Sequence, residues 1–198
     1  MEVKLLTPEC FIKEMENVAA LAALTCRANT EREYIPREVL GRIIKAGHES
    51  ILEHITLTYS VKWLSRACLQ EVARHRHISL SVESTRHTLM KRLKDAEWHN
   101  KMWEACPKRC AGIVQHLLEV IAGYGDIPND ELKYYLPEFW PTNLILTSNI
   151  RELRHIIKLR TAPAALNEFR VLGYSLYEAV PEEYRYLLED CVYREKSE

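Results

Sequence analysis

The sequence is poor in glycine and has no glycine-rich loop of the kind that binds phosphate. Only six glycines occur among its 198 residues, and none belongs to a Gly-x-Gly-x-x-Gly motif. In dinucleotide-binding proteins, that motif lets backbone amides approach the diphosphate closely. A Rossmann-type cofactor site is therefore disfavoured.

Cysteine is present but never in the paired spacing that is typical of zinc or redox motifs. The six cysteines are scattered, and none forms a Cys-x-x-Cys pair. We expect reduced thiols, mostly packed as small hydrophobic side chains. Cys106 and Cys110, one helical turn apart, could form a redox pair or half of a metal site, but no second pair accompanies them.

A strong charge of either sign and long apolar runs are also lacking. The net charge of −1 argues against broad attraction to nucleic acid or to membranes. No apolar run reaches the roughly 20 residues that span a bilayer. The first residues, MEVKLLTPE, lack the apolar stretch of a signal peptide. We therefore expect a cytoplasmic protein whose partners include no nucleic-acid polymer and no membrane.

The periodicity of apolar residues predicts a mixed protein of helices and strands. Alternation of apolar and polar residues over 53–62 predicts the clearest strand. Weaker strands are expected at 3–6 and 144–147, and 26–36 is expected to be a loop. Helical spacing predicts helices at 8–25, 36–46, 63–74, 95–122 (one helix or two, ended by Gly123, Gly125 and Pro128), 129–135, 149–160 and 164–179. One α/β domain of the α+β type, spanning 1–198, is the predicted fold.

Residues 74–86 concentrate three arginines, two histidines and three serines without any glycine or proline. Arginine presents a planar fork of donors that suits phosphate, and serine hydroxyls can complete an anion cradle. The alternative is a solvated basic helix end that binds nothing in particular.

The histidines and cysteines offer two further hypotheses. His48, His54, His75 and His77 could in principle hold zinc. The arginines beside His75 would repel a cation, so polar packing or contact with an anionic or aromatic ligand is favoured, and no metal is expected. Cys26 and Cys68 could act as nucleophiles, but neither lies in a turn or at a helix start that would activate it.

A second polar group is expected on the helix that begins at Asn149. Arg151 and His155 are four residues apart and share a face, with Arg160 at the far end. Alone, these residues could simply form a solvated face. Together with residues 74–86, they indicate a site for a polyanion such as a nucleotide or a phosphorylated protein segment.

The chain resembles a known family. Arg74-His75-Arg76, seven further residues and Ser84 match the signature of the flavin-dependent thymidylate synthases. The flanking sequences agree in order and spacing over nearly the whole chain: His48-Glu49-Ser50, Glu53-His54, Ser65-Arg66-Ala67-Cys68, Ser84-Thr85-Arg86, Leu136-Pro137, Thr142, Asn149-Ile150-Arg151-Glu152-Leu153 and Leu159-Arg160.

The resemblance implies an enzyme that converts dUMP to dTMP. Methylenetetrahydrofolate would supply the one-carbon unit, and FAD reduced by NADPH would supply the hydride. The family fold is a mainly antiparallel sheet flanked by long helices. It assembles as a homotetramer whose active sites are built from several chains. Two alternatives stay open: a relative that acts on another pyrimidine nucleotide, and a nucleotide- or flavin-binding protein without catalysis.

The resemblance also assigns roles to individual residues. The residues expected to hold FAD are His48, Arg74, His75, Arg76, Asn149, Arg151, His155 and Cys26. The residues expected to hold dUMP are Glu71, Arg74, Ser84, Thr85, Arg86, Lys133 and Arg160, with Arg86 and Lys133 gripping the phosphate. Ser84 and Arg160 are the catalytic candidates. Arg160 would favour the ionised uracil nitrogen, so that no enzyme nucleophile is required.

Several residues depart from the family pattern and bear on substrate preference. Lys133 replaces an arginine, which exchanges a bidentate fork for a point charge. Glu71 replaces a glutamine and would repel a uracil anion unless it is protonated or turned away. The other departures are Val82, His87, His155, Ala164 and Leu166.

Overall fold

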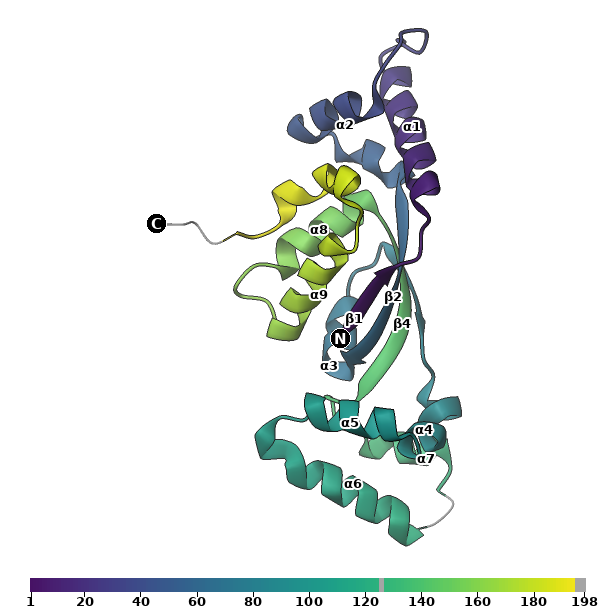
Figure 1. Ribbon diagram of the computed structural model, residues 1–198, viewed down its shortest axis with the longest axis vertical. Coiled ribbons are helices and arrows are strands. Elements are labelled where there is room, and N and C mark those ends of the chain that lie inside the picture. Colours follow the sequence, from purple (N-terminus) through teal and green to yellow (C-terminus); the bar gives the residue numbers. More distant parts are fainter. Residues whose placement is uncertain (125–126, 195–198) are drawn as a thin grey trace. The chain divides into compact units, whose positions relative to one another are not determined.

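The computed structural model describes residues 1–124 and 127–194, and it is a mixed helix and sheet protein (Figure 1). The strands are β1 (Glu2–Leu5), β2 (Thr56–Ser65), β3 (Ile78–Val82) and β4 (Pro141–Asn149). The α-helices are α1 (Glu9–Thr25), α2 (Pro36–Lys45), α3 (Arg66–Val72), α4 (Thr85–Leu93), α5 (Ala96–Ala105), α6 (Ala111–Tyr124), α7 (Asn129–Leu132), α8 (Ile150–Arg160) and α9 (Asn167–Glu178). Short 3₁₀ helices are η1 (Glu49–His54), η2 (Lys108–Cys110), η3 (Lys133–Tyr135), η4 (Glu182–Leu187) and η5 (Glu189–Cys191).

The four strands form one sheet in the order β1-β2-β4-β3. Strands β2 and β4 run antiparallel, because the Trp63 amide bonds to the Asn143 side chain while Thr58 lies beside Thr147. Leu57, Tyr59 and other alternate residues of β2 are fully buried, as the alternating pattern predicted.

The chain divides into two compact units, which we describe separately. Unit 1 contains Met1 with 61–74 and 81–144, and unit 2 contains 2–60, 75–80 and 145–198. The boundary passes through β2, β3 and β4, so each of these strands contributes residues to both units.

Unit 1 has a tryptophan-rich core. The ring of Trp98 lies 5.0 Å from that of Trp63 and 6.2 Å from that of Trp140. Leucines of α4, α6 and α7, together with Met102 of α5, pack into the same cluster. This cluster holds the helices of unit 1 together by burial of apolar surface.

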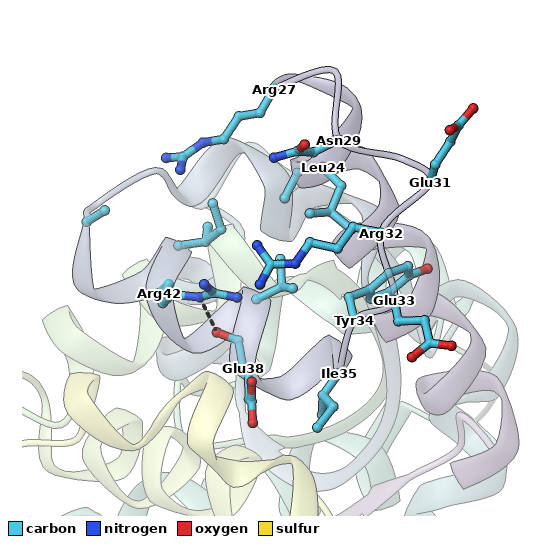
Figure 2. Close-up of a pocket in the computed structure, with 14 residues that line it drawn as sticks. Leu24, Arg27, Asn29, Glu31, Arg32, Glu33, Tyr34, Ile35, Glu38 and Arg42 are labelled. Atoms are coloured by element: carbon cyan, nitrogen blue, oxygen red, sulfur yellow. Dashed lines mark hydrogen bonds between the residues drawn. The ribbon is translucent and has the colours of Figure 1, made fainter.

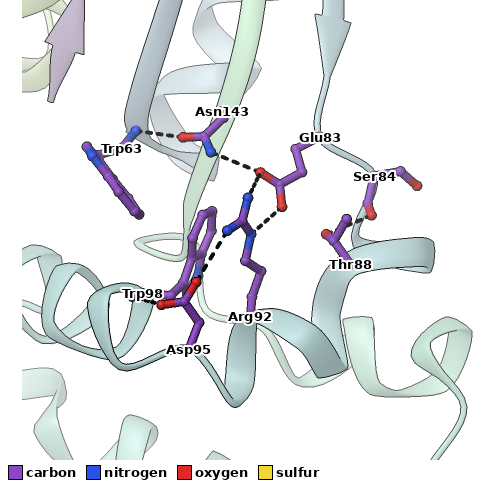
Figure 3. Close-up of polar contacts among 8 residues, drawn as sticks. All are labelled: Trp63, Glu83, Ser84, Thr88, Arg92, Asp95, Trp98 and Asn143. Carbon is purple, nitrogen blue, oxygen red and sulfur yellow. Dashed lines mark hydrogen bonds and ion pairs between the residues drawn. The ribbon is translucent and has the colours of Figure 1, made fainter.

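One ion pair at the edge of this core joins the end of β3 to α4 (Figure 3). Arg92 donates two hydrogen bonds to Glu83, at 2.6 and 2.9 Å, and its guanidinium lies 4.2 Å from the Trp98 ring centroid. Asn143 of β4 also donates to Glu83 and accepts from the Trp63 amide. The hydrogen bond and charge of Arg92 hold the pKa of Glu83 below its ordinary value, although burial alone would raise it. Because Ser84 follows Glu83, the network fixes where α4 begins.

Unit 2 is built around α8, which packs against α9 and η1, while α9 contacts β1. The apolar face of α8 is fully buried, as its spacing predicted. Arg154 lies on that face with a side chain only 4% exposed. It donates to Glu49, to the Leu187 carbonyl and twice to Asp190, which ties the C-terminal segment to α8 and η1. Burial opposes the charge of Arg154, but these partners outweigh burial and raise its pKa.

Most of the predicted elements are confirmed, but the region around the basic stretch differs. The helix expected at 63–74 begins only at Arg66, because β2 continues to Ser65, whose side chain then caps α3 through the Cys68 amide. Strand β3 and helix α4 were not predicted, although Ile78, Leu80 and Val82 alternate with two serines in the way that is typical of a strand. The helical region at 95–122 forms two helices that are separated at Pro107, and α9 begins at Asn167. Gly125, which was expected to help end α6, lies outside the described residues.

All six cysteines are free thiols, as expected. Cys68 and Cys191 are buried, Cys106 and Cys110 are partly buried with Cys106 packed against the core of unit 1, and Cys10 and Cys26 are exposed. In the described part of the chain, no helix combines the length and the apolar character that crossing a membrane requires.

We expect Asp190→Ala to lower the free energy of unfolding by about 1–2 kcal/mol at neutral pH. The variant removes a partner of buried Arg154, but Asp190 is itself 52% exposed, so the loss is smaller than for a fully buried pair. Arg154 holds the pKa of Asp190 below 3.8. The stabilisation is therefore present above about pH 4 and is lost as the pH falls through the folded pKa.

Denaturant unfolding of wild type and variant at several pH values measures this difference, which should shrink in acid. Glu189→Ala, which removes an exposed carboxylate one residue away, is the matched control. An equal loss of stability in both variants would contradict the role of the Arg154–Asp190 pair.

Candidate functional site

The best-defined polar group of unit 2 is centred on His75, the middle residue of the Arg-His-Arg signature. His75 Nδ1 lies 3.0 Å from Glu152 Oε1, and the two side chains are only 5% and 11% exposed. Arg160 Nε donates to His75 Nε2 at 3.2 Å. Because arginine can only donate, Nε2 must be the acceptor, and the ring proton therefore lies on Nδ1 and is donated to Glu152.

The surroundings of His75 favour the neutral ring. Burial lowers its pKa below the ordinary value of 6.5; the hydrogen bond to Glu152 opposes this shift, and the positive charge of Arg160 adds to it. A neutral ring is also what the hydrogen bond from Arg160 requires, because a protonated Nε2 could not accept it. Burial and hydrogen-bond geometry therefore both favour the neutral His75 ring.

Arg160 is held by a second contact. Its guanidinium lies 4.5 Å from the ring centroid of Phe169, which is fully buried on α9. That ring in turn meets the His75 ring edge-on, with centroids 6.0 Å apart. Cation–π contact and hydrogen bonding together restrict the orientation of the Arg160 guanidinium at the end of α8.

Of the remaining predicted flavin residues of unit 2, Asn149, Arg151 and His155 lie at the start of α8 or along it, and the other three lie elsewhere in the unit. The side-chain oxygen of Asn149 caps α8 by accepting from the Glu152 amide, as the sequence predicted. Arg151 forms an exposed ion pair with Glu53 at 2.5 Å. The exposed His155 ring lies 5.8 Å from that of His75. His48, Arg76 and Cys26 are also exposed; His48 precedes η1, and Cys26 follows α1.

Unit 1 contains most of the residues predicted to bind dUMP. Ser84 precedes the first turn of α4, in which Thr85 and Arg86 follow. Arg86 makes a bidentate ion pair with Asp130 of α7, and Lys133 lies 4.0 Å from the same carboxylate. The structure thus brings together the two cations that were predicted to grip a phosphate.

Glu71, the departure that was expected to repel a uracil anion, pairs with Arg74. The Arg74 Nη1 and Glu71 Oε1 atoms are 3.4 Å apart. Glu71 lies in the last turn of α3, and Arg74 follows the end of that helix three residues later. The arginine offsets the negative charge of this carboxylate.

A pocket of about 870 Å³ lies in unit 2 between the end of α1, the loop that follows it, and α2 (Figure 2). Its lining includes Arg27, Arg32 and Arg42 together with Glu31, Glu33 and Glu38, so the charges balance. The sequence analysis assigned no role to these residues, and the neighbouring Cys26 is not part of the lining. Among residues 1–124 and 127–194, no cluster of three or more His, Cys, Asp or Glu side chains is arranged to hold a metal ion.

Three residues of these groups were missed by sequence reasoning. Glu152 was expected only as a capping partner of Asn149, and its contact with His75 joins segments 77 residues apart. Phe169 and Asp130 likewise reach their partners through tertiary packing. The only available signal was their placement on predicted helices, which does not identify a partner.

Comparison with known proteins gives one consistent result. The family model described as "Thymidylate synthase complementing protein" matches residues 10–184. A flavin-dependent thymidylate synthase of Campylobacter jejuni (strain RM1221) is 37% identical over 182 residues, which cover 86% of this chain and 85% of that protein. The corresponding protein of Helicobacter pylori (strain J99) is 34% identical and covers 89% of this chain and 94% of its own length.

Solved structures agree with the sequence relatives. Thymidylate synthase X from Helicobacter pylori, crystallised with FAD and dUMP, superposes with a TM-score of 0.82 at 30% identity, over 98% of this chain and 100% of that one. This similarity confirms the predicted fold of helices and an antiparallel sheet. The family match covers most of the chain, and the chain therefore belongs to the flavin-dependent thymidylate synthases, the family of thymidylate synthase complementing proteins.

Proposed function

We propose that this chain catalyses the reductive methylation of dUMP to dTMP with FAD as cofactor, methylenetetrahydrofolate as one-carbon donor and NADPH as reductant. The observation that carries the proposal is the buried hydrogen-bonded series Glu152–His75–Arg160, which links the signature motif to the predicted catalytic arginine. We further propose that 1–198 acts as one functional domain, because related chains of similar length share its fold. From the family resemblance, we propose that the chain works as a cytoplasmic homotetramer.

The residues of unit 2 fit a flavin dinucleotide. Arg76 and Arg151 are exposed cations that suit a diphosphate, and no glycine loop is needed where guanidinium forks replace backbone amides. Exposed imidazoles at His48 and His155 can contact an aromatic ring system or donate to its carbonyl oxygens. Asn149 and Cys26 of unit 2 complete the proposed set, together with Arg74, which belongs to unit 1. Both ring nitrogens of His75 form hydrogen bonds within the protein, so its proposed role is to position Arg160.

The residues of unit 1 fit a nucleotide monophosphate. Arg86 and Lys133 supply positive charge, and the start of α4 presents the favourable end of a helix dipole beside the Ser84 and Thr85 hydroxyls. The network of Glu83, Arg92 and Asn143 holds this helix start in place. The pair with Arg74 and the access of water to both side chains reduce the repulsion between the Glu71 carboxylate and an anionic base.

Arg160 supplies the electrostatic part of catalysis in this proposal. Its guanidinium stabilises negative charge on the uracil ring nitrogen, which enriches carbon 5 in electrons for attack on the one-carbon carrier. Neutral His75 holds the guanidinium without adding a competing positive charge, and Glu152 holds the tautomer of His75. When bound, FAD supplies the hydride transfer, for which no amino-acid side chain is suited.

The proposal predicts a yellow protein that releases tritium from dUMP labelled at carbon 5. Release should require methylenetetrahydrofolate and NADPH, because replacing the ring hydrogen depends on both. Turnover of UMP or dCMP in preference to dUMP would instead favour the related nucleotide methyltransferase. A yellow protein with no release would identify a binding protein without catalysis.

We expect Arg160→Ala to keep bound flavin and to lower kcat by about 10²–10³, the usual cost of losing one preorganised charge-stabilising group. Lys158→Ala removes an exposed cation from the same helical turn and should leave kcat unchanged. Flavin absorbance and tritium release measure the two properties separately. Wild-type turnover in Arg160→Ala would remove the role that we assign to this residue.

Glu152→Gln should change both the rate and its pH dependence. An amide can donate as well as accept, so it permits the tautomer in which His75 Nε2 carries a proton and faces the Arg160 donor. We expect kcat at pH 8 to fall about 10- to 100-fold through misplacement of Arg160. In wild type, activity should decline as the pH falls through the His75 pKa, which lies below 6.5.

The same variant should move that decline to lower pH, because the hydrogen bond and charge of Glu152 raise the His75 pKa. Rate profiles from pH 5 to 8 at saturating substrate check the shift. Glu178→Gln, an exposed neutralisation on α9, is the control. If the rate of Glu152→Gln declines at the same acidic pH as that of wild type, protonation of His75 does not control the reaction.

A further inference from the structure

Asp130 lies at the point where the two phosphate-binding cations of unit 1 converge. Its Oδ1 atom is 2.7 Å from Arg86 Nε and 4.0 Å from Lys133 Nζ, while Oδ2 is 3.3 Å from Arg86 Nη2. One carboxylate oxygen therefore faces both cations. A phosphate held by Arg86 and Lys133 together must place an oxygen at that point, so the carboxylate and the phosphate compete for it.

The side chain of the neighbouring Asn129 holds the chain at Asp130 against the backbone of α4. Asn129 Nδ2 donates to the Arg86 carbonyl at 2.8 Å, and Asn129 Oδ1 accepts from the Met90 amide at 3.2 Å. These two bonds fasten the start of α7 to α4, and Asp130 is the next residue. The backbone at Asp130 is thereby held beside α4, the helix that carries Arg86.

The Arg86–Asp130 ion pair has favourable geometry but contributes little free energy. A bidentate arrangement is the best one for a guanidinium and a carboxylate. Both side chains are nevertheless well exposed, at 62% for Arg86 and 57% for Asp130, so water screens their attraction. Such a pair can hold the cations in a ligand-free protein and still be exchanged for a ligand of higher charge.

We propose that Asp130 is an internal competitor for the nucleotide phosphate, occupying its position on Arg86 and Lys133 until dUMP displaces it. This rests on the proposed function, in which these cations hold the 5′-phosphate. A phosphate monoester carries about −1.5 to −2 charges at neutral pH against −1 for a carboxylate, so it can displace Asp130. After the reaction, Asp130 can recapture the cations, which weakens the hold on dTMP and speeds its release.

The test compares Asp130→Asn with wild type as flavin-loaded enzymes. The amide keeps the shape of the side chain and removes its charge. Isothermal titration should show dUMP, dTMP and inorganic phosphate binding about three- to tenfold more tightly to the variant, the scale expected of an exposed ion pair and the repulsion removed with it. Stopped-flow release of dTMP should slow by a similar factor. Glu131→Gln, which removes the next carboxylate of α7, is the matched control and should change each Kd less than twofold.

Deoxyuridine separates phosphate contacts from base contacts, and its affinity should be the same in all three proteins. Weaker dUMP binding by Asp130→Asn would show that Asp130 positions Arg86, and this would overturn the proposal, as would unchanged affinity for all three anions. If dUMP binds to none of the proteins while inorganic phosphate binds Asp130→Asn more tightly, the competing role of Asp130 stands and the nucleotide assigned in the proposed function is wrong.

Discussion

The hydrogen bonds on either side of the His75 ring are the constraint on which the candidate catalytic arrangement depends. A buried imidazole between a carboxylate and a guanidinium has only one proton arrangement that satisfies all three groups, namely the neutral ring with its proton on Nδ1. Burial and the Arg160 charge both favour that neutral form. The direction of the Arg160 guanidinium is thereby set by Glu152, a residue that does not belong to the signature.

A comparable arrangement holds the polar residues of unit 1. Glu83 ends the segment after β3 and is fixed by Arg92 and Asn143, while Arg92 lies over the Trp98 ring. The tryptophan core thus supports an ion pair, and the ion pair sets the start of α4, from which Ser84, Thr85 and Arg86 are presented. In both units, polar residues of the proposed site are oriented by side chains to which the sequence analysis assigned no ligand, namely Glu152 and Phe169 in unit 2 and Glu83, Arg92 and Asn143 in unit 1.

The structure shows the charged partners of two residues that depart from the family pattern, Glu71 and Lys133. Glu71 is paired with Arg74, so its charge is offset within its own helix and the turn that follows. Lys133 is near the carboxylate that also binds Arg86, and a flexible point charge can shift between a carboxylate and a phosphate more readily than a fork committed to two hydrogen bonds. In both cases a carboxylate of the protein is paired with a cation of the proposed site, and neither pair conflicts with the activity proposed for the chain.

The sequence alone determined the family, most helix positions and the identity of the candidate site residues. The alternation of β2, the capping of α8 by Asn149 and the position of α2 behind Pro36 depend on neighbours within a few residues, which is why local patterns predicted them. The signature and its flanks carried the functional hypothesis in the same way, as residues at fixed spacing.

Tertiary structure decided the rest. Helix α4 is mostly polar, so its form depends on packing of Leu89 and Leu93 in the core around Trp98. Strand β3 does alternate apolar residues with serines, but only its pairing with β4 places it in the sheet. The contacts of His75 with Glu152 and of Arg86 with Asp130 join residues 77 and 44 positions apart, and Arg160 meets Phe169 across the connection between α8 and α9. Local propensity carries no information about such contacts, because hydrogen bonds and charge pairs depend on distances in space that only the packed chain establishes.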